Sequence, residues 1–152
     1  MEYKEKLNSI KKIQNHQIMI DELVKFNEEI DSLEINNYDS YYLLIDSLML
    51  LGIEYYLVKN NKEANYYFNK VVEFGEKYKD YSKDNYYDII NCAYSWLVYY
   101  AFEDKDFDTV NKYCNIVLRN YSTVKDDPNY YVTEKESVDI CKKYLDALKK
   151  NS

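Results

Sequence analysis

The chain has 152 residues, which fits one domain with a core large enough to be stable without a disulfide or a metal. Its two glycines and single proline are too few for the tight turns of a sandwich, a barrel or a doubly wound sheet, so we expect an all-α protein. The net charge of −7 would repel a phosphate backbone or an anionic membrane surface, which argues against nucleic-acid and membrane binding.

Nothing in the sequence indicates export or membrane insertion. No run of about 18 apolar residues occurs, and the first residues lack the apolar core of a secretion signal. The three cysteines form neither a C-x-x-C motif nor an even disulfide set, and we interpret Cys114 and Cys141 as small core hydrophobes. These features predict a cytoplasmic protein.

The first part of the chain, residues 1–35, is expected to form an N-terminal helix or helix pair. Apolar residues follow at three- and four-residue steps over 3–33, but the polar triplet Asn15-His16-Gln17 interrupts them, so one long helix and two shorter ones both remain open. We expect a second helix from about Ser40 to Val58, capped by Asp39.

A third helix is predicted to extend to about Tyr78, because Asn60 followed by Glu63 is a capping arrangement. Ser82 is the expected cap of a fourth helix, which ends near Phe102.

Asp106 is placed to cap a fifth helix over 107–120. The stretch 121–132 reads as the longest loop, because it contains an Asp-Asp-Pro-Asn run. Thr133 and Glu136 form a capping box for a last helix over 133–150, whose final lysines suit the negative end of the helix dipole.

An internal echo at an offset of 46 residues links the second and third helices to the fourth and fifth. Most positions of the echo are apolar or aromatic in both copies, and a short polar break recurs between the two helices of each. The matched pairs are Ile45 and Asn91, Leu48 and Tyr94, Leu51 and Leu97, Gly52 and Val98, Tyr55 and Ala101, Ala64 and Val110, Phe68 and Cys114, and Val71 and Val117. This pattern predicts a repeated helical hairpin over residues 40–120.

The first copy resembles the tetratricopeptide (TPR) family of helical repeats. Gly52, Tyr55, Ala64 and Phe68 match, in order and spacing, the small residue and aromatic of that family's first helix and the alanine and aromatic of its second. The second copy matches less well, the proline typical of the family is missing, and the offset exceeds the family's usual length. The resemblance implies one domain, 1–152, with about six to seven helices in a right-handed superhelix and a C-terminal capping helix over 133–150. A closed bundle of antiparallel hairpins is the alternative.

In the TPR family the first helix of each hairpin lines a concave surface that binds peptides or proteins. Carried onto this chain, that surface would be apolar and aromatic, with little charge. Its residues would be Asp46, Met49, Ile53 and Tyr56 from one hairpin, and Cys92, Ser95, Tyr99 and Phe102 from the next. The lysine and asparagine that clamp a terminal carboxylate in co-chaperones of this family are not found at these places.

The sequence carries no motif for catalysis. His16 is the only histidine, which excludes a multi-histidine metal site, and we interpret it as a solvated or helix-end residue. The two glycines lie too far apart for a phosphate-binding loop. We therefore expect no enzyme activity, no cofactor and no metal.

Three functions remain open. The first is a non-catalytic module that binds a protein or peptide in the aromatic groove. The second is a stoichiometric inhibitor, such as an immunity or antitoxin protein, that covers a basic toxin or nuclease with its acidic surface. The third is an enzyme of helical fold with an unrecognised site. A homodimer is compatible with all three, because the 20 tyrosines favour exposed aromatic surface that suits an interface.

Overall fold

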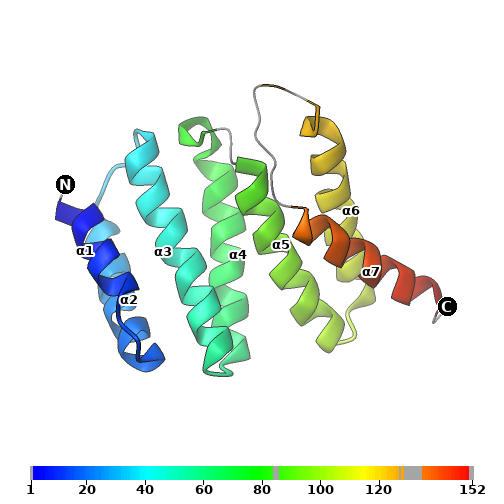
Figure 1. Cartoon of the computed structure of the whole chain (residues 1–152), viewed down its shortest axis with the longest axis horizontal. Coiled ribbons are helices and arrows are strands. Elements are labelled where there is room, and N and C mark those ends of the chain that lie inside the picture. Colours follow the sequence, from blue (N-terminus) through cyan, green and yellow to red (C-terminus); the bar gives the residue numbers. More distant parts are fainter. Residues whose placement is uncertain (1, 84–85, 127, 129–134, 151–152) are drawn as a thin grey trace. The chain divides into compact units, whose positions relative to one another are not determined.

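The computed structural model describes residues 2–83, 86–126, 128 and 135–150, and over these ranges it is all-helical (Figure 1). It contains seven α-helices, one short 3-10 helix and no strand in the part of the chain that is described. The chain divides into two compact units, Met1–Ser82 and Lys83–Ser152. The prediction of an all-α protein is confirmed.

The first unit is built from four α-helices in which each helix packs against the next and α1 also packs against α3. The elements are α1 (Glu2–Lys11), α2 (His16–Ile30), α3 (Tyr38–Leu57), α4 (Asn61–Lys77) and the 3-10 helix η1 (Lys79–Tyr81). The stretch 3–33 is therefore two helices. The polar triplet separates them because the side chain of Asn15 accepts a hydrogen bond from the backbone N–H of Ile18 and caps α2.

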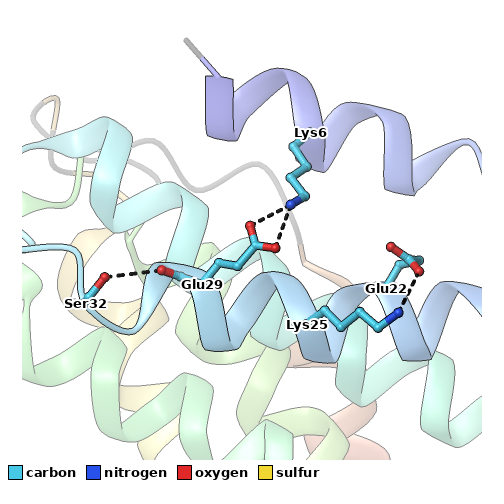
Figure 2. A network of polar contacts seen from close by, with 5 residues as sticks. All are labelled: Lys6, Glu22, Lys25, Glu29 and Ser32. Atoms are coloured by element: carbon cyan, nitrogen blue, oxygen red, sulfur yellow. Dashed lines mark hydrogen bonds and ion pairs between the residues drawn. The ribbon is translucent and has the colours of Figure 1, made fainter.

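The core of the first unit is formed by apolar residues of α1, α2 and α3 that recur at helical spacing. Leu23 and Phe26 of α2 are fully buried, as is Leu51 of α3. At the surface, Lys6 of α1 donates to both carboxylate oxygens of Glu29 of α2, at 2.7 and 2.6 Å (Figure 2). Both side chains are exposed, so packing of the apolar faces supplies most of the attachment of α1 to α2.

Helix α3 begins two residues earlier than predicted. Its cap is Asn37, whose side-chain oxygen accepts from the backbone N–H of Ser40 at 2.8 Å, while the Ser40 hydroxyl accepts from the backbone N–H of Asn37. Asp39 is inside the first turn, where its negative charge favours the helix dipole. The prediction of Asp39 as the cap was wrong because the reciprocal Asn37–Ser40 pair satisfies the free backbone donors instead.

The second unit contains α5 (Tyr86–Glu103), α6 (Phe107–Val124) and α7 (Glu136–Lys150), and each of these helices packs against the other two. Helix α6 continues beyond the predicted end at residue 120, because Asn120 donates to the side-chain oxygen of Asn91 on α5 and Val124 is buried. The first residues of the predicted loop therefore belong to α6.

The caps predicted for α5 and α7 have different outcomes. Ser82 does not cap α5: its hydroxyl donates to the backbone oxygen of Lys79 and closes η1. Thr133, the predicted cap of the last helix, lies outside the described residues, although α7 ends on the expected lysines.

Each hairpin contains a turn of the same conformation, and the two turns are separated by the predicted offset of 46 residues. Lys59 and Lys105 both adopt a positive φ, 63° and 59°, at the second position after the ends of α3 and α5. In each turn the next residue, Asn60 or Asp106, donates its backbone N–H to a carbonyl five residues back, at 2.9 Å in both cases. The side chains of Asn60 and Asp106 then cap α4 and α6, as predicted. The echo in the sequence is thus a repeated structure.

Gly52 allows α3 and α4 to pack closely. A Cβ atom at this position would lie 2.6 Å from Cε1 and 2.8 Å from Cδ1 of Phe68, whose ring is fully buried. The offset places Val98 and Cys114 at the equivalent positions of α5 and α6, and both are buried. The first hairpin thus has a small residue and a large one at these two positions, and the second has a larger residue and a smaller one.

Candidate partner-binding surfaces

The predicted residues of α3 lie on one stripe along that helix. Their spacing of three and four residues places them on the same face, and the structure leaves each of them half-buried. The same spacing extends the stripe toward the start of α3, where two further half-buried aromatic residues belong to it. The α3 stripe consists of Tyr38, Tyr42, Asp46, Met49, Ile53 and Tyr56.

Helix α1 covers the first part of the α3 stripe. Lys11, at the end of α1, forms an ion pair with Asp46 at 2.5 Å and donates to the hydroxyl of Tyr42 at 3.3 Å, with its ammonium 5.4 Å from the ring centre. Burial alone would lower the pKa of Lys11, but the contacts with Asp46 and Tyr42 together outweigh it and the pKa is raised. Asp46 therefore fixes α1 on α3 and is not a bare groove residue.

A surface pocket of about 230 Å³ opens beside the first turns of α3. Lys4 of α1 supplies a cation to its lining, and Tyr38 and Tyr42 supply aromatic rings. Asp39 and the apolar side chain of Leu43 complete the lining. Such a mixture can hold a side chain that is apolar in its body and polar at its tip.

Tyr41 lies in the same turn of α3 but is fully buried. Its hydroxyl oxygen has no hydrogen-bond partner among the described residues. Burial, and to a lesser extent the neighbouring Tyr38, raises the pKa of Tyr41 to about 12. The ring contributes to packing, while its hydroxyl is desolvated without compensation.

The second part of the α3 stripe lies beyond the end of α1. Between Ile53 and Tyr55 of α3, the carboxylate of Glu54 is nearly buried, and it accepts from Nδ1 of His16 at 2.6 Å. His16 is the first residue of α2, so this contact attaches the start of α2 to the end of α3. The histidine is a helix-end residue, as predicted, and its carboxylate partner was not predicted.

The predicted residues of α5 are more tightly packed than those of α3. Ser95 is buried, and its hydroxyl donates to the backbone oxygen of Cys92 at 2.7 Å. Phe102 packs against Phe107 of α6 and Tyr144 of α7, with ring centres 5.6 and 4.9 Å apart. Cys92 and Tyr99 are half-buried. Helix α7 thus covers one end of the face on which these residues lie.

A second aromatic surface, which the sequence did not single out, is centred on a stacked pair of tyrosines. The rings of Tyr55 on α3 and Tyr67 on α4 are 5.6 Å apart and nearly parallel, at 7°. Burial raises the pKa of Tyr67 to about 12, with further contributions from Tyr55 and from carboxylates that include Glu63 and Glu28. Burial, Glu63 and Asp21 raise the pKa of Tyr55. Carboxylates from α2 and α4 therefore lie close to the stacked rings, and we call this group the acidic tyrosine surface.

Over the described residues, no group of three or more histidine, cysteine or acidic side chains could hold a metal ion. None of the described helices combines the length and hydropathy that crossing a membrane requires. Comparison with protein-family models, curated proteins and solved structures finds no match.

Proposed function

We propose that this protein is a non-catalytic module that binds a protein or peptide along the α3 stripe. The observation that carries the proposal is the partial exposure of the α3 stripe, whose residues Met49, Ile53 and Tyr56 follow the part that α1 covers. Side chains that are half-buried and aromatic lose little conformational entropy on binding and bury a large apolar area.

The lengths of the helices support this assignment. Helix α1 has 10 residues and α3 has 20, so α1 spans about 15 Å and α3 about 30 Å. The contacts of Lys4 and Lys11 place α1 along the first half of α3. Met49, Ile53 and Tyr56 lie past its end, where an amphipathic helix or an extended apolar segment can pack.

The pocket at the start of α3 adds a point of specificity. It adjoins Tyr38 and Tyr42, so a partner that follows the stripe would place one side chain beside Lys4 and Asp39. A pocket that holds one anchor residue next to a longer apolar contact is the usual arrangement at peptide-binding surfaces.

We also propose a TPR-like arrangement of the helices within each hairpin. Its support is the repeated turn at Lys59 and Lys105, the close approach of Gly52 and Phe68, and the packing of α1 on α3 and of α5 on α7. In a hairpin of this kind the first helix faces the ligand, which assigns that role to α3.

The test is a pull-down with the tagged protein from a lysate of its own source, followed by mass spectrometry. The test variant combines Met49→Gln and Ile53→Gln, and the matched control is Ile18→Gln, because Ile18 is an apolar residue that is 53% exposed on α2. We expect a partner that the wild type and the control retain and that the double variant loses. Circular dichroism and thermal melting establish that all three proteins are folded.

The salt dependence of partner binding distinguishes this function from one based on charge. Apolar contacts persist at about 0.5 M salt, where exposed charges are screened beyond about 4 Å. A partner that binds the double variant as well as the wild type would refute binding along the α3 stripe.

A stoichiometric inhibitor of a basic protein is the second candidate, and the acidic tyrosine surface favours it. Carboxylates near stacked tyrosine rings can receive a lysine or arginine of a partner through charge and cation–π contacts. This function predicts a basic partner that is released by about 0.5 M salt. Glu28→Gln with Glu63→Gln would weaken such a complex, and the Met49 and Ile53 double variant would leave it intact.

A further inference from the structure

Helix α1 is attached to the first unit by few apolar side chains. Its buried residues are Leu7 and Ile10, whereas the 15 residues of α2 include five that are buried. The half-buried Tyr3 adds an edge contact with the Phe26 ring of α2, with ring centres 6.3 Å apart. Detachment of α1 therefore exposes much less apolar surface than unfolding of the whole unit.

The polar contacts of α1 differ in how much they contribute to its attachment. Lys6 and Glu29 are each 43% exposed, so this ion pair with α2 contributes little (Figure 2). Lys11 is more deeply placed, and its ammonium contacts both Asp46 and the hydroxyl of Tyr42. Lys11 is thus the main polar attachment of α1 to the α3 stripe.

Helix α1 is also a weak helix by itself. Its 10 residues are fewer than the roughly 12–15 that an isolated helix needs in water. The exposed middle positions are Asn8 and Ser9, two residues of low helix propensity. Once released, α1 would lose its helical structure together with its contacts.

The start of α2 is held in place without α1. The side chain of Asn15 caps α2 by accepting from the backbone N–H of Ile18 at 2.9 Å. The next residue, His16, contacts the carboxylate of Glu54 on α3 through Nδ1, at 2.6 Å. The chain can therefore open at the link 12–15 while α2 stays folded on α3.

We propose that α1 is a cover that opens separately from the rest of the first unit and uncovers the first half of the α3 stripe. Opening removes Lys11 from Tyr42 and Asp46, and it removes Lys4 from the pocket beside Tyr38. The docking surface then extends from the last three residues of the stripe to all six. The competition between α1 and a partner rests on the proposed function, whereas the opening of α1 does not.

Hydrogen–deuterium exchange of the full chain, read by mass spectrometry, tests the opening. After correction for intrinsic rates, we expect the amides of α1 to exchange at least about tenfold faster than the amides of the buried face of α2. Equal protection of the two helices would overturn the proposal, because α1 would then open only when the whole unit unfolds.

Two variants change the opening in opposite directions. Lys11→Gln removes the contact with Asp46 and should speed exchange in α1 several-fold without changing α2. Asn8→Ala combined with Ser9→Ala strengthens the helix at exposed positions and should slow exchange in α1 roughly fivefold. The matched control is Lys12→Gln, an exposed lysine of the link, which should leave both helices unchanged. A variant that changes exchange in α1 and α2 equally would overturn the proposal.

The partner that the pull-down retains then serves as the probe of competition. Its dissociation constant should rise for the double alanine variant by about the factor by which α1 exchange slows, because fewer molecules are open. Equal affinity for the wild type and this variant would overturn the role of α1 as a cover. Failure to find any partner would refute the proposed function, and the exchange rates would still decide whether α1 opens separately.

Discussion

Replacing Tyr41 with phenylalanine should make the protein more stable, although it removes a polar group from the chain. The substitution keeps the fully buried ring and deletes only the hydroxyl, whose oxygen has no hydrogen-bond partner among the described residues. Removing a buried hydroxyl usually lowers the stability of a protein, because the hydrogen bond of that hydroxyl is lost. Here the wild type bears the cost of desolvating the hydroxyl and gains no bond in return.

The change in stability has two contributions, one at neutral pH and one that appears only at alkaline pH. A buried polar group without a partner costs about 1–3 kcal/mol, so the free energy of unfolding at neutral pH should rise by at least about 1 kcal/mol in Tyr41→Phe. For a cooperative unit the size of Met1–Ser82, about 1 kcal/mol corresponds to a rise in melting temperature of about 4–8 °C.

Alkaline pH should increase the difference. The pKa of Tyr41 is about 12 in the folded protein, against about 10 in an unfolded chain. Between these values the unfolded chain releases the tyrosine proton while the folded protein retains it, so unfolding releases a proton and stability falls as pH rises. The loss grows to roughly 2 kcal/mol as the pH nears 12 in the wild type, and the phenylalanine variant does not share it.

Urea unfolding followed by circular dichroism at pH 7 and pH 11 measures both terms. Tyr66→Phe is the matched control, because Tyr66 is 50% exposed and should change stability little at either pH. A Tyr41→Phe protein that is less stable than the wild type at pH 7 would refute the reasoning, since it would mean that the hydroxyl is hydrogen-bonded.

Three further changes test the packing and the turns. Gly52→Ala should lower the free energy of unfolding by about 1–3 kcal/mol, because its methyl group would meet the Phe68 ring. A second change, Phe68→Leu, should recover part of this loss in urea unfolding, and losses that simply add in the double variant would contradict this. Lys59→Gly and Lys105→Gly should each raise the free energy of unfolding by about 1 kcal/mol, and with it the melting temperature, because glycine adopts a positive φ without strain. The control Lys59→Ala removes the charge but keeps the strain, so it should give no such gain. Asn37→Ala should cost about 1 kcal/mol and speed hydrogen exchange in the first turn of α3, and unchanged exchange there would mean that the cap carries no weight.

The sequence was sufficient to predict that the chain is helical and which residues share one face of α3. Apolar residues at three- and four-residue steps mark a helix without knowledge of its neighbours, and Asn60 and Asp106 cap their helices through local contacts. The start of α3 was missed because Asn37 and Asp39 are both good cap residues. The choice between them depends on the reciprocal bond with Ser40.

The candidate surfaces were predicted only in part, because tertiary packing decides whether another helix covers a residue. Tyr38 and Tyr42 continue the stripe of Asp46 at four-residue steps, a signal that the repeat comparison overlooked because it began at Ile45. No local pattern shows that Lys11 reaches Asp46 from another helix. In the same way, the contact between Phe102 and Tyr144 depends on how α7 packs against α5.

The exchange of sizes between the two hairpins changes the chemistry of their interiors. At the repeat positions where the first hairpin has Gly52 and Phe68, the second has Val98 and Cys114, and both of these residues are fully buried. A phenylalanine ring has no ionisable atom, whereas a thiol at the equivalent repeat position has one. The two copies have the same turn and differ in the chemical groups that fill their interiors.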